Sequence, residues 1–201
     1  MSAKPIRKIT LTPALVFELS LALVGLAGIW LFGLQVPLAG LAPASAVVLG
    51  TLAGFFTLVL LSGISRLSWF FPDSLRRHVR DLHGFARGFS LPALALLSLA
   101  AGIGEEVLFR GFLQTGLVAL AGPLPGIVAA ALLFGLVHCL SLAYFLMASL
   151  LGILLGLAYA VTDSLLLVVT WHAVYDLVAL VLLARFPHWL GLEADTAGET
   201  H

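Results

Sequence analysis

Carboxylates, imidazoles and one guanidinium occur at helical spacing inside segments that are otherwise apolar. Glu105 and Glu106 lie within an apolar run from Leu91 to Leu120, and Arg110 follows Glu106 by four residues. Residues four apart share a helix face, so Glu106 and Arg110 can pair. Glu105 points about 100° away from Glu106. We therefore expect different roles, one carboxylate being held by Arg110 while the other faces a cavity.

Two later segments contribute imidazoles. His138 follows Phe134 by one helical turn, and His172 precedes Asp176 by the same spacing. Each pattern alone has a structural explanation, such as an interhelical hydrogen bond or a clamp between helices. A charged side chain at bilayer depth costs roughly 2.5–3.5 kcal/mol on insertion scales, and such groups usually line a cavity or pathway. We predict that these groups converge on one polar site with a carboxylate and an imidazole for general acid–base chemistry.

The composition identifies the environment of this site. Of the 201 residues, 61% are hydrophobic and 10% are charged, whereas soluble domains average about 45–50% and 25%. The long apolar segments predict an all-α, polytopic transmembrane helical bundle rather than a barrel of short alternating strands. The formal net charge is zero, so nothing indicates nucleic-acid binding, and the single Cys139 cannot form an intramolecular disulfide.

The apolar segments predict about six spans, at residues 14–34, 44–65, 91–120, 126–140, 143–161 and 164–185. We expect Thr12-Pro13, Ser90 with Pro92, and Thr162-Asp163-Ser164 to start helices, with Asp163 as an N-cap rather than a catalytic acid. No Gly or Pro marks the break between the fourth and fifth spans. Glu18 lies near the start of the first span, where its side chain is expected to reach the headgroups.

Residues 66–90 form a basic segment with an aromatic anchor, Trp69-Phe70-Phe71. After Pro72, apolar residues repeat on one helical face: Leu75, Val79, Leu82, Phe85 and Phe89. This pattern predicts an amphipathic helix on the membrane surface, with a simple connecting loop as the alternative. Basic residues here and in the N-terminal tail predict that both chain termini are cytoplasmic.

The predicted organisation has three parts. Residues 1–90 hold two spans and the interfacial helix, residues 91–185 hold the catalytic core, and residues 186–201 form a tail. Glu105 lies deep in its span while His138 lies near the end of its own. Spacing alone therefore does not establish that the polar groups meet.

The polar residues match three motifs of a known family in order: E-E-x-x-x-R at Glu105, Glu106 and Arg110, F-x-x-x-H at Phe134 and His138, and H-x-x-x-N/D at His172 and Asp176. In this order on successive helices they resemble the CPBP family of intramembrane proteases. That family contains the type II CAAX prenyl proteases and the Abi bacteriocin-processing and self-immunity proteins. The resemblance covers about residues 90–185.

The resemblance implies an intramembrane endopeptidase that hydrolyses a peptide bond. It implies that Glu105 acts as general base on a water with help from His138, that Glu106 holds Arg110, and that His172 and residue 176 stabilise the oxyanion. Asp176 departs from the better donor, asparagine, because an ionised aspartate cannot donate a hydrogen bond. Asp176 suits orientation of His172 or metal ligation better.

The family is described both as metal-dependent and as metal-free. If a metal is used, zinc is the candidate ion, and the candidate ligands are Glu105, His138, His172 and Asp176; we favour no permanent metal. The expected partners are membrane lipid and a peptide or membrane-protein substrate, in a prokaryotic plasma membrane. The alternative is a non-enzymatic immunity or scaffold protein, or a proton-linked carrier, with the same polar cluster. The sequence does not indicate an oligomeric state.

Overall fold

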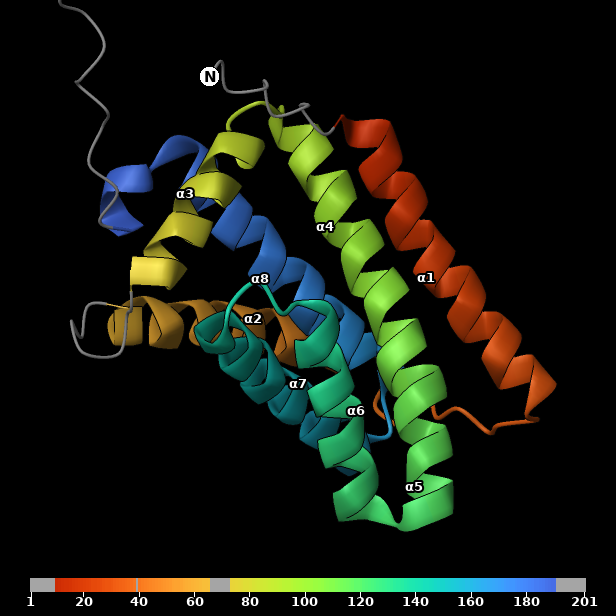
Figure 1. Cartoon of the computed structure of the whole chain (residues 1–201). Coiled ribbons are helices and arrows are strands. Elements are labelled where there is room, and N and C mark those ends of the chain that lie inside the picture. The colour runs from red at the N-terminus through yellow and green to blue at the C-terminus, as the bar shows by residue number, and fades with distance from the viewer. Residues whose placement is uncertain (1–9, 39, 66–72, 191–201) are drawn as a thin grey trace, which may run out of the picture.

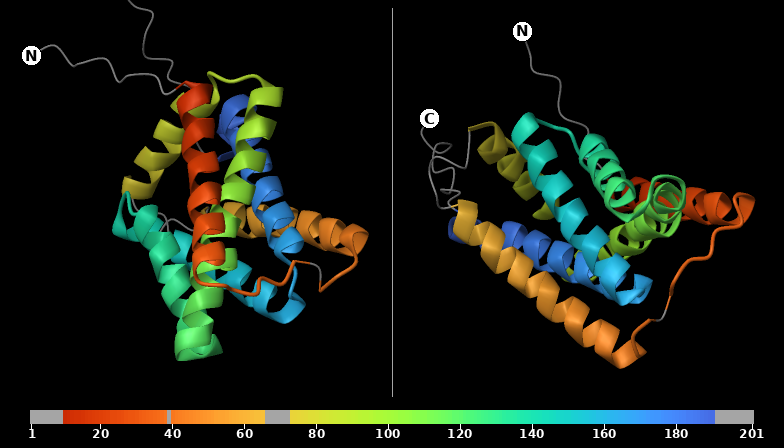
Figure 2. Two further views of the ribbon diagram at one scale, coloured as in Figure 1. Left: turned by 90° about the vertical axis from the view of Figure 1, so that its right-hand side faces the viewer. Right: turned by 90° about the horizontal axis from the view of Figure 1, so that it is seen from below.

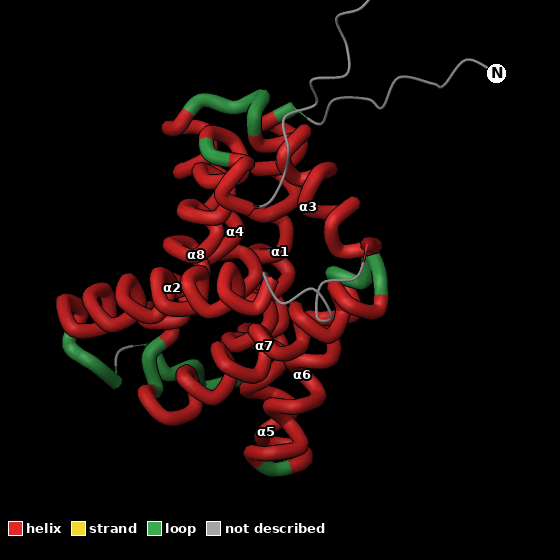
Figure 3. Tube along the Cα trace, turned by 90° about the vertical axis from the view of Figure 1, so that its left-hand side faces the viewer, coloured by secondary structure: helices red, strands yellow, loops and turns green. Residues whose placement is uncertain are grey.

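The computed structural model describes residues 10–38, 40–65 and 73–190, and the regular structure in these ranges is helical (Figures 1 and 3). The elements are α1 (Leu11–Leu31), α2 (Pro43–Ser65), α3 (Asp73–Ala86), α4 (Leu91–Glu106), η1 (Val107–Gln114), α5 (Thr115–Ala121), α6 (Pro123–Val137), α7 (Leu142–Thr162), α8 (Leu165–Arg185) and the short η2 (Pro187–Leu190).

Among the described residues, five helical segments are long and apolar enough to cross a membrane. They are α1, most of α2, α7, α8 and the continuous rod formed by α4, η1 and α5, which has 31 residues. The shorter α6 is also apolar. The prediction of an all-α bundle with about six spans is confirmed.

The helix starts follow local capping chemistry. Ser90 caps α4 by accepting a hydrogen bond from the amide of Ala93, as predicted, and Ser141 caps α7 in the same way. Two predictions are corrected. Thr10 rather than Thr12 precedes α1, and Ser164 rather than Asp163 caps α8. Asp163 instead ends α7 in the left-handed conformation, at φ 48°, which aspartate tolerates better than most residues.

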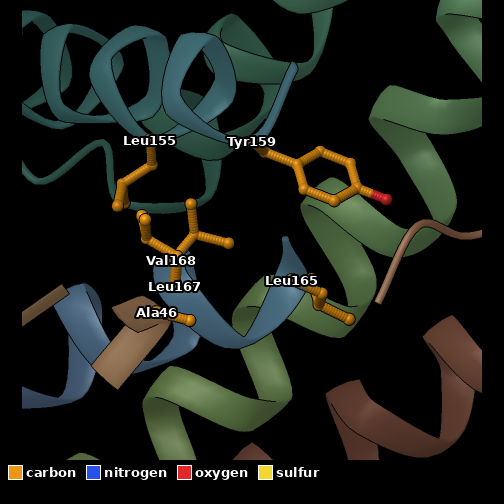
Figure 4. Packing of buried hydrophobic residues seen from close by; sticks show 6 residues of the cluster. All are labelled: Ala46, Leu155, Tyr159, Leu165, Leu167 and Val168. Atoms are coloured by element: carbon orange, nitrogen blue, oxygen red, sulfur yellow. The ribbon is translucent and has the colours of Figure 1, made fainter. Parts of the chain in front are cut away.

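The helices pack in pairs around α4 and α8. α1 runs along α4, α8 lies between α4 and α2, and α6 pairs with α7 (Figures 1 and 2). One buried apolar cluster joins α2, α7 and α8 (Figure 4): Ala46, Leu155, Tyr159, Leu165, Leu167 and Val168. This arrangement packs the N-terminal helices directly against the helices that carry the predicted site.

The basic segment contains a helix rather than only a connecting loop. Val79, Leu82 and Phe89 pack against a small buried cluster that includes Leu94 of α4 and Leu183 of α8. His83 Nδ1 lies 2.6 Å from the carbonyl of Leu183. The apolar face of α3 is therefore covered in part by the protein itself. The predicted anchor Trp69-Phe70-Phe71 lies outside the described residues.

Candidate active site

Glu106 is the centre of a fully buried ionic network. Its side chain is 0% exposed, and its Oε1 accepts a hydrogen bond of 3.0 Å from Nη1 of Arg110. The same oxygen lies 2.7 Å from Nδ1 of His172, which reaches it from α8. The predicted pairing of Glu106 with Arg110 is confirmed. The contact with His172 is additional, and it joins two helices.

Arg110 extends this network to a third helix. Its Nη2 donates a hydrogen bond of 3.0 Å to the carbonyl of Gly152 in α7. One turn later, Gln114 donates a hydrogen bond of 2.9 Å to the carbonyl of Gly156. Sequence reasoning missed Gln114. The available signal was a polar residue inside an apolar run, four positions after Arg110. Two parallel contacts therefore fix the rod to α7.

Arg110 and Gln114 both belong to a π-helical segment, η1, which begins directly after the two glutamates. A π-helix widens the backbone turn and is frequent at functional sites. The hydroxyl of Thr115 donates to the carbonyl of Arg110, five residues earlier, at 2.9 Å. The sequence did not predict this change of helix type.

Glu105 faces a different partner, His138, which ends α6 as its C-cap residue. His138 Nε2 lies 3.5 Å from Oε2 of Glu105, a distance too long for a good hydrogen bond. His138 Nδ1 lies 2.8 Å from the carbonyl of Phe134. A neutral ring that donates from Nδ1 leaves Nε2 as an acceptor. Two acceptors then face each other without a proton between them.

Phe134 forms the wall between the two imidazoles. Its ring stacks on His138 at 4.5 Å between centroids and meets the edge of His172 at 6.0 Å. The guanidinium carbon of Arg110 lies 4.9 Å from the centroid of the same ring. A single aromatic side chain thus touches three of the predicted site residues and sets the spacing between the two histidines.

His172 is held between two carboxylates. Nδ1 contacts Glu106, whereas Nε2 lies 3.6 Å from Oδ2 of Asp176, one turn later in α8. The first contact is a short hydrogen bond and the second is a loose approach. The imidazole orientation is consequently fixed from the buried side, and Nε2 points toward Asp176.

The predicted site residues are therefore brought together by helices far apart in the sequence. The rod supplies Glu105, Glu106 and Arg110, α6 supplies Phe134 and His138, and α8 supplies His172 and Asp176. Glu105 is 7% exposed and His172 is 4% exposed, whereas the side chains of His138 and Asp176 are 28% and 29% exposed. The cluster is therefore buried at Glu105 and His172 and partly exposed at His138 and Asp176. Spacing alone left this meeting of the helices open.

The prediction for Glu18 is wrong. Its Oε2 is buried instead of extending outward, and it has no hydrogen-bond partner among the described residues. α1 approaches α4 so closely at this point that a Cβ on Gly104 would overlap the carbonyl of Glu18. The carboxyl group of Glu18 is near enough to interact electrostatically with four site residues: Glu105, His138, His172 and Asp176.

The candidate metal ligands do not form a donor set. Zinc needs three or more donors at about 2.0–2.3 Å from one point. Among the described residues, no three His, Cys, Asp or Glu side chains are placed to hold a metal ion. Glu105 with His138 and His172 with Asp176 instead form two separate pairs.

A helical membrane protein with buried carboxylate–imidazole pairs on separate spans has the composition of an intramembrane hydrolase site. Comparison with known proteins supports this class: residues 87–178 match the family described as type II CAAX prenyl endopeptidase Rce1-like. The matched part of the chain contains all three motifs that resemble the CPBP family.

A curated relative from Bacillus subtilis (strain 168), described as uncharacterized protein YpbD, is 31% identical over 138 residues. The match covers 65% of this chain and 66% of the relative, so it spans just under two thirds of that protein. No solved structure matches the chain.

Proposed function

We propose that this protein is an intramembrane endopeptidase in which Glu105 and His138 activate a water for attack on a peptide bond. The observation that carries this proposal is the contrast between the two glutamates. Oε1 of Glu106 already accepts a hydrogen bond from Nη1 of Arg110 and lies within hydrogen-bond distance of Nδ1 of His172. Oε2 of Glu105 has no hydrogen-bond partner among the described residues and faces His138 across 3.5 Å. Oε2 of Glu106 also has no hydrogen-bond partner among the described residues, but the Glu106 side chain is 0% exposed. The Glu105 side chain is 9% exposed and faces that of His138, which is 28% exposed, so Glu105 is the carboxylate that we assign to a water.

In the proposed reaction, Glu105 accepts a proton from the water as its oxygen bonds to the carbonyl carbon of the substrate. His138 accepts the second O–H of that water as a hydrogen bond and orients it. The carbonyl oxygen becomes an oxyanion in the tetrahedral intermediate. Glu105 then returns the proton to the leaving nitrogen as the carbon–nitrogen bond breaks. The products are a new carboxyl terminus and a free amine.

The oxyanion requires a positioned donor. His172 is the proposed donor, because its ring is held between Glu106 at Nδ1 and Asp176 near Nε2. Asp176 accepts and does not donate when ionised. Its proposed role is accordingly to orient His172 rather than to contact the oxyanion. No step in this mechanism uses a metal ion.

The proposed substrate is a peptide or a membrane-protein segment that reaches the bundle from the membrane. The family description names prenyl endopeptidases. The shared chemistry is a peptide bond held close to a bilayer, and a lipid anchor is one way to hold it there. Lipidated and unlipidated peptides are therefore both included in the test.

The test is hydrolysis by the purified full chain in lipid nanodiscs. Peptides with and without a prenyl group are incubated in heavy-oxygen water, and mass spectrometry locates the label. We expect one heavy oxygen in the new carboxyl terminus and no cleavage by Glu105→Ala or His138→Ala variants that remain folded. Cleavage that persists in both variants would reject the assignment. A scaffold or immunity protein would instead keep its biological activity in Glu105→Gln.

A further inference from the structure

Glu18 brings a third carboxyl group to the side of the site that Glu105 occupies. The backbone of Glu18 packs against Gly104, which directly precedes Glu105, the proposed base. Oε2 of Glu18 and Oε2 of Glu105 are both buried and without a hydrogen-bond donor among the described residues. Glu105 itself has a side chain that is only 9% exposed. Two facing helices thus each leave a buried carboxylate oxygen unpaired at the same level of the bundle.

The groups of the site that can carry a positive charge already have partners. Arg110 donates to Glu106 and to the carbonyl of Gly152. His172 lies between Glu106 and Asp176, and His138 lies between the Phe134 carbonyl and Glu105. The described site therefore has four carboxylates, one guanidinium and two imidazoles: Glu18, Glu105, Glu106, Asp176, Arg110, His138 and His172. Glu18 is the carboxylate that no described cation approaches to ion-pair distance.

An unpaired carboxylate in a low-dielectric site is stabilised by any positive charge that approaches it. Glu18 is only half-buried as a residue, although its Oε2 is buried. At a substrate site, the cation that can arrive and leave is one carried by the substrate.

We propose that Glu18 determines specificity by binding a positively charged side chain or amine of the substrate next to the scissile bond. The proposal rests on the proposed function, because it assigns the substrate class of the same site. It predicts a preference for a basic residue at one position near the cleavage point and discrimination against an acidic residue there.

The test uses a matched peptide series and the full chain in lipid nanodiscs. One position at a time, on each side of the scissile bond, carries lysine, norleucine or glutamate. Norleucine retains the apolar stem of lysine without its charge. Both kcat/KM and the equilibrium Kd are measured, the latter by fluorescence anisotropy, for wild type, Glu18→Gln and Glu18→Lys. Asp163→Asn is the control, because it removes one carboxylate at an exposed helix end where asparagine tolerates the left-handed backbone.

For wild type and Asp163→Asn we expect lysine to be favoured over norleucine by about tenfold at one position. The ratio should fall close to one in Glu18→Gln, and glutamate should become the favoured residue in Glu18→Lys. A lysine-to-norleucine ratio near one in wild type would overturn the proposal. A ratio in Glu18→Gln that equals the wild-type ratio would also overturn it. An equal fall in kcat/KM for every peptide in Glu18→Gln would overturn it as well, because Glu18 would then act in hydrolysis rather than in charge recognition.

The two measurements separate this proposal from the proposed function. A lysine preference in Kd without any turnover would support charge recognition and contradict hydrolysis. Turnover without a charge preference would contradict only the role of Glu18.

Discussion

Glu105 and Glu106 are adjacent in the chain, both are buried, and each leaves Oε2 without a hydrogen-bond partner among the described residues, yet their other contacts differ. Glu106 receives two short contacts from Arg110 and His172, and the network continues to the backbone of α7. Glu105 has one loose contact, with His138 at 3.5 Å. The contacts at Oε1 of Glu106 are suited to holding helices in place, and the loose side, at Glu105, is suited to reacting. The proposed function accordingly assigns a structural role to Glu106 and the chemistry to Glu105.

The largest expected effect comes from breaking the ion pair between Glu106 and Arg110. Arg110→Met leaves Glu106 buried without its permanent cation and removes the contact with Gly152. Removing one partner of a buried ion pair typically costs about 3–5 kcal/mol. We expect a lower free energy of unfolding by about that amount, measured by thermal or denaturant unfolding in detergent micelles.

The matched control for that experiment is Arg77→Met, which removes an exposed arginine from α3. Its unfolding free energy should stay within about 0.5 kcal/mol of wild type. Similar stability of Arg110→Met and Arg77→Met would contradict a structural role for the Glu106 network.

Breaking the loose side should affect turnover rather than stability. His138→Ala removes the group that orients the water, and general acid–base contributions are typically 10²–10⁴-fold. We expect kcat/KM to fall by about 10²-fold or more while the unfolding transition changes little. His172→Ala should lower both quantities, because His172 also contacts Glu106. Equal changes of kcat/KM and of unfolding free energy in His138→Ala and His172→Ala would contradict the distinction between Glu105 and Glu106.

The spacing between α1 and α4 gives a smaller test. A Cβ on Gly104 would overlap the carbonyl of Glu18, so Gly104→Ala must displace one helix. We expect a cost of about 1–3 kcal/mol in unfolding free energy and reduced turnover. Gly84→Ala in α3, where a Cβ meets nothing within 4 Å, should be neutral or stabilising by up to about 1 kcal/mol. Similar results for both glycines would contradict the close crossing.

The smallest expected effect is that of metal removal. The carboxylates and imidazoles form separate pairs rather than a donor set. Treatment with EDTA or 1,10-phenanthroline should therefore change kcat/KM by less than about twofold. Loss of activity that zinc restores would show that the site rearranges to bind a metal.

The sequence predicted the parts of this site that depend on local spacing. Glu106 with Arg110 and His172 with Asp176 are four residues apart, so a single helix places each pair on one face. Apolar length likewise predicted the spans, and Ser90 the start of α4. These features need no knowledge of how the helices pack.

The remaining features depend on contacts between helices. His172 reaches Glu106 from α8, and His138 reaches Glu105 from the end of α6. Glu18 belongs to the site only because Gly104 lets α1 approach α4 closely. Position along its own helix predicted a headgroup location for Glu18, and that reasoning cannot include the neighbouring helix.

The central claim is most directly tested by exchanging each glutamate for its isosteric amide. We predict that Glu105→Gln keeps the unfolding free energy of wild type but loses peptide hydrolysis by at least about 10²-fold. Glu106→Gln should instead have a lower unfolding free energy than wild type. Full turnover in Glu105→Gln, or a loss of hydrolysis confined to a stably folded Glu106→Gln, would contradict the assignment of Glu105 as the base.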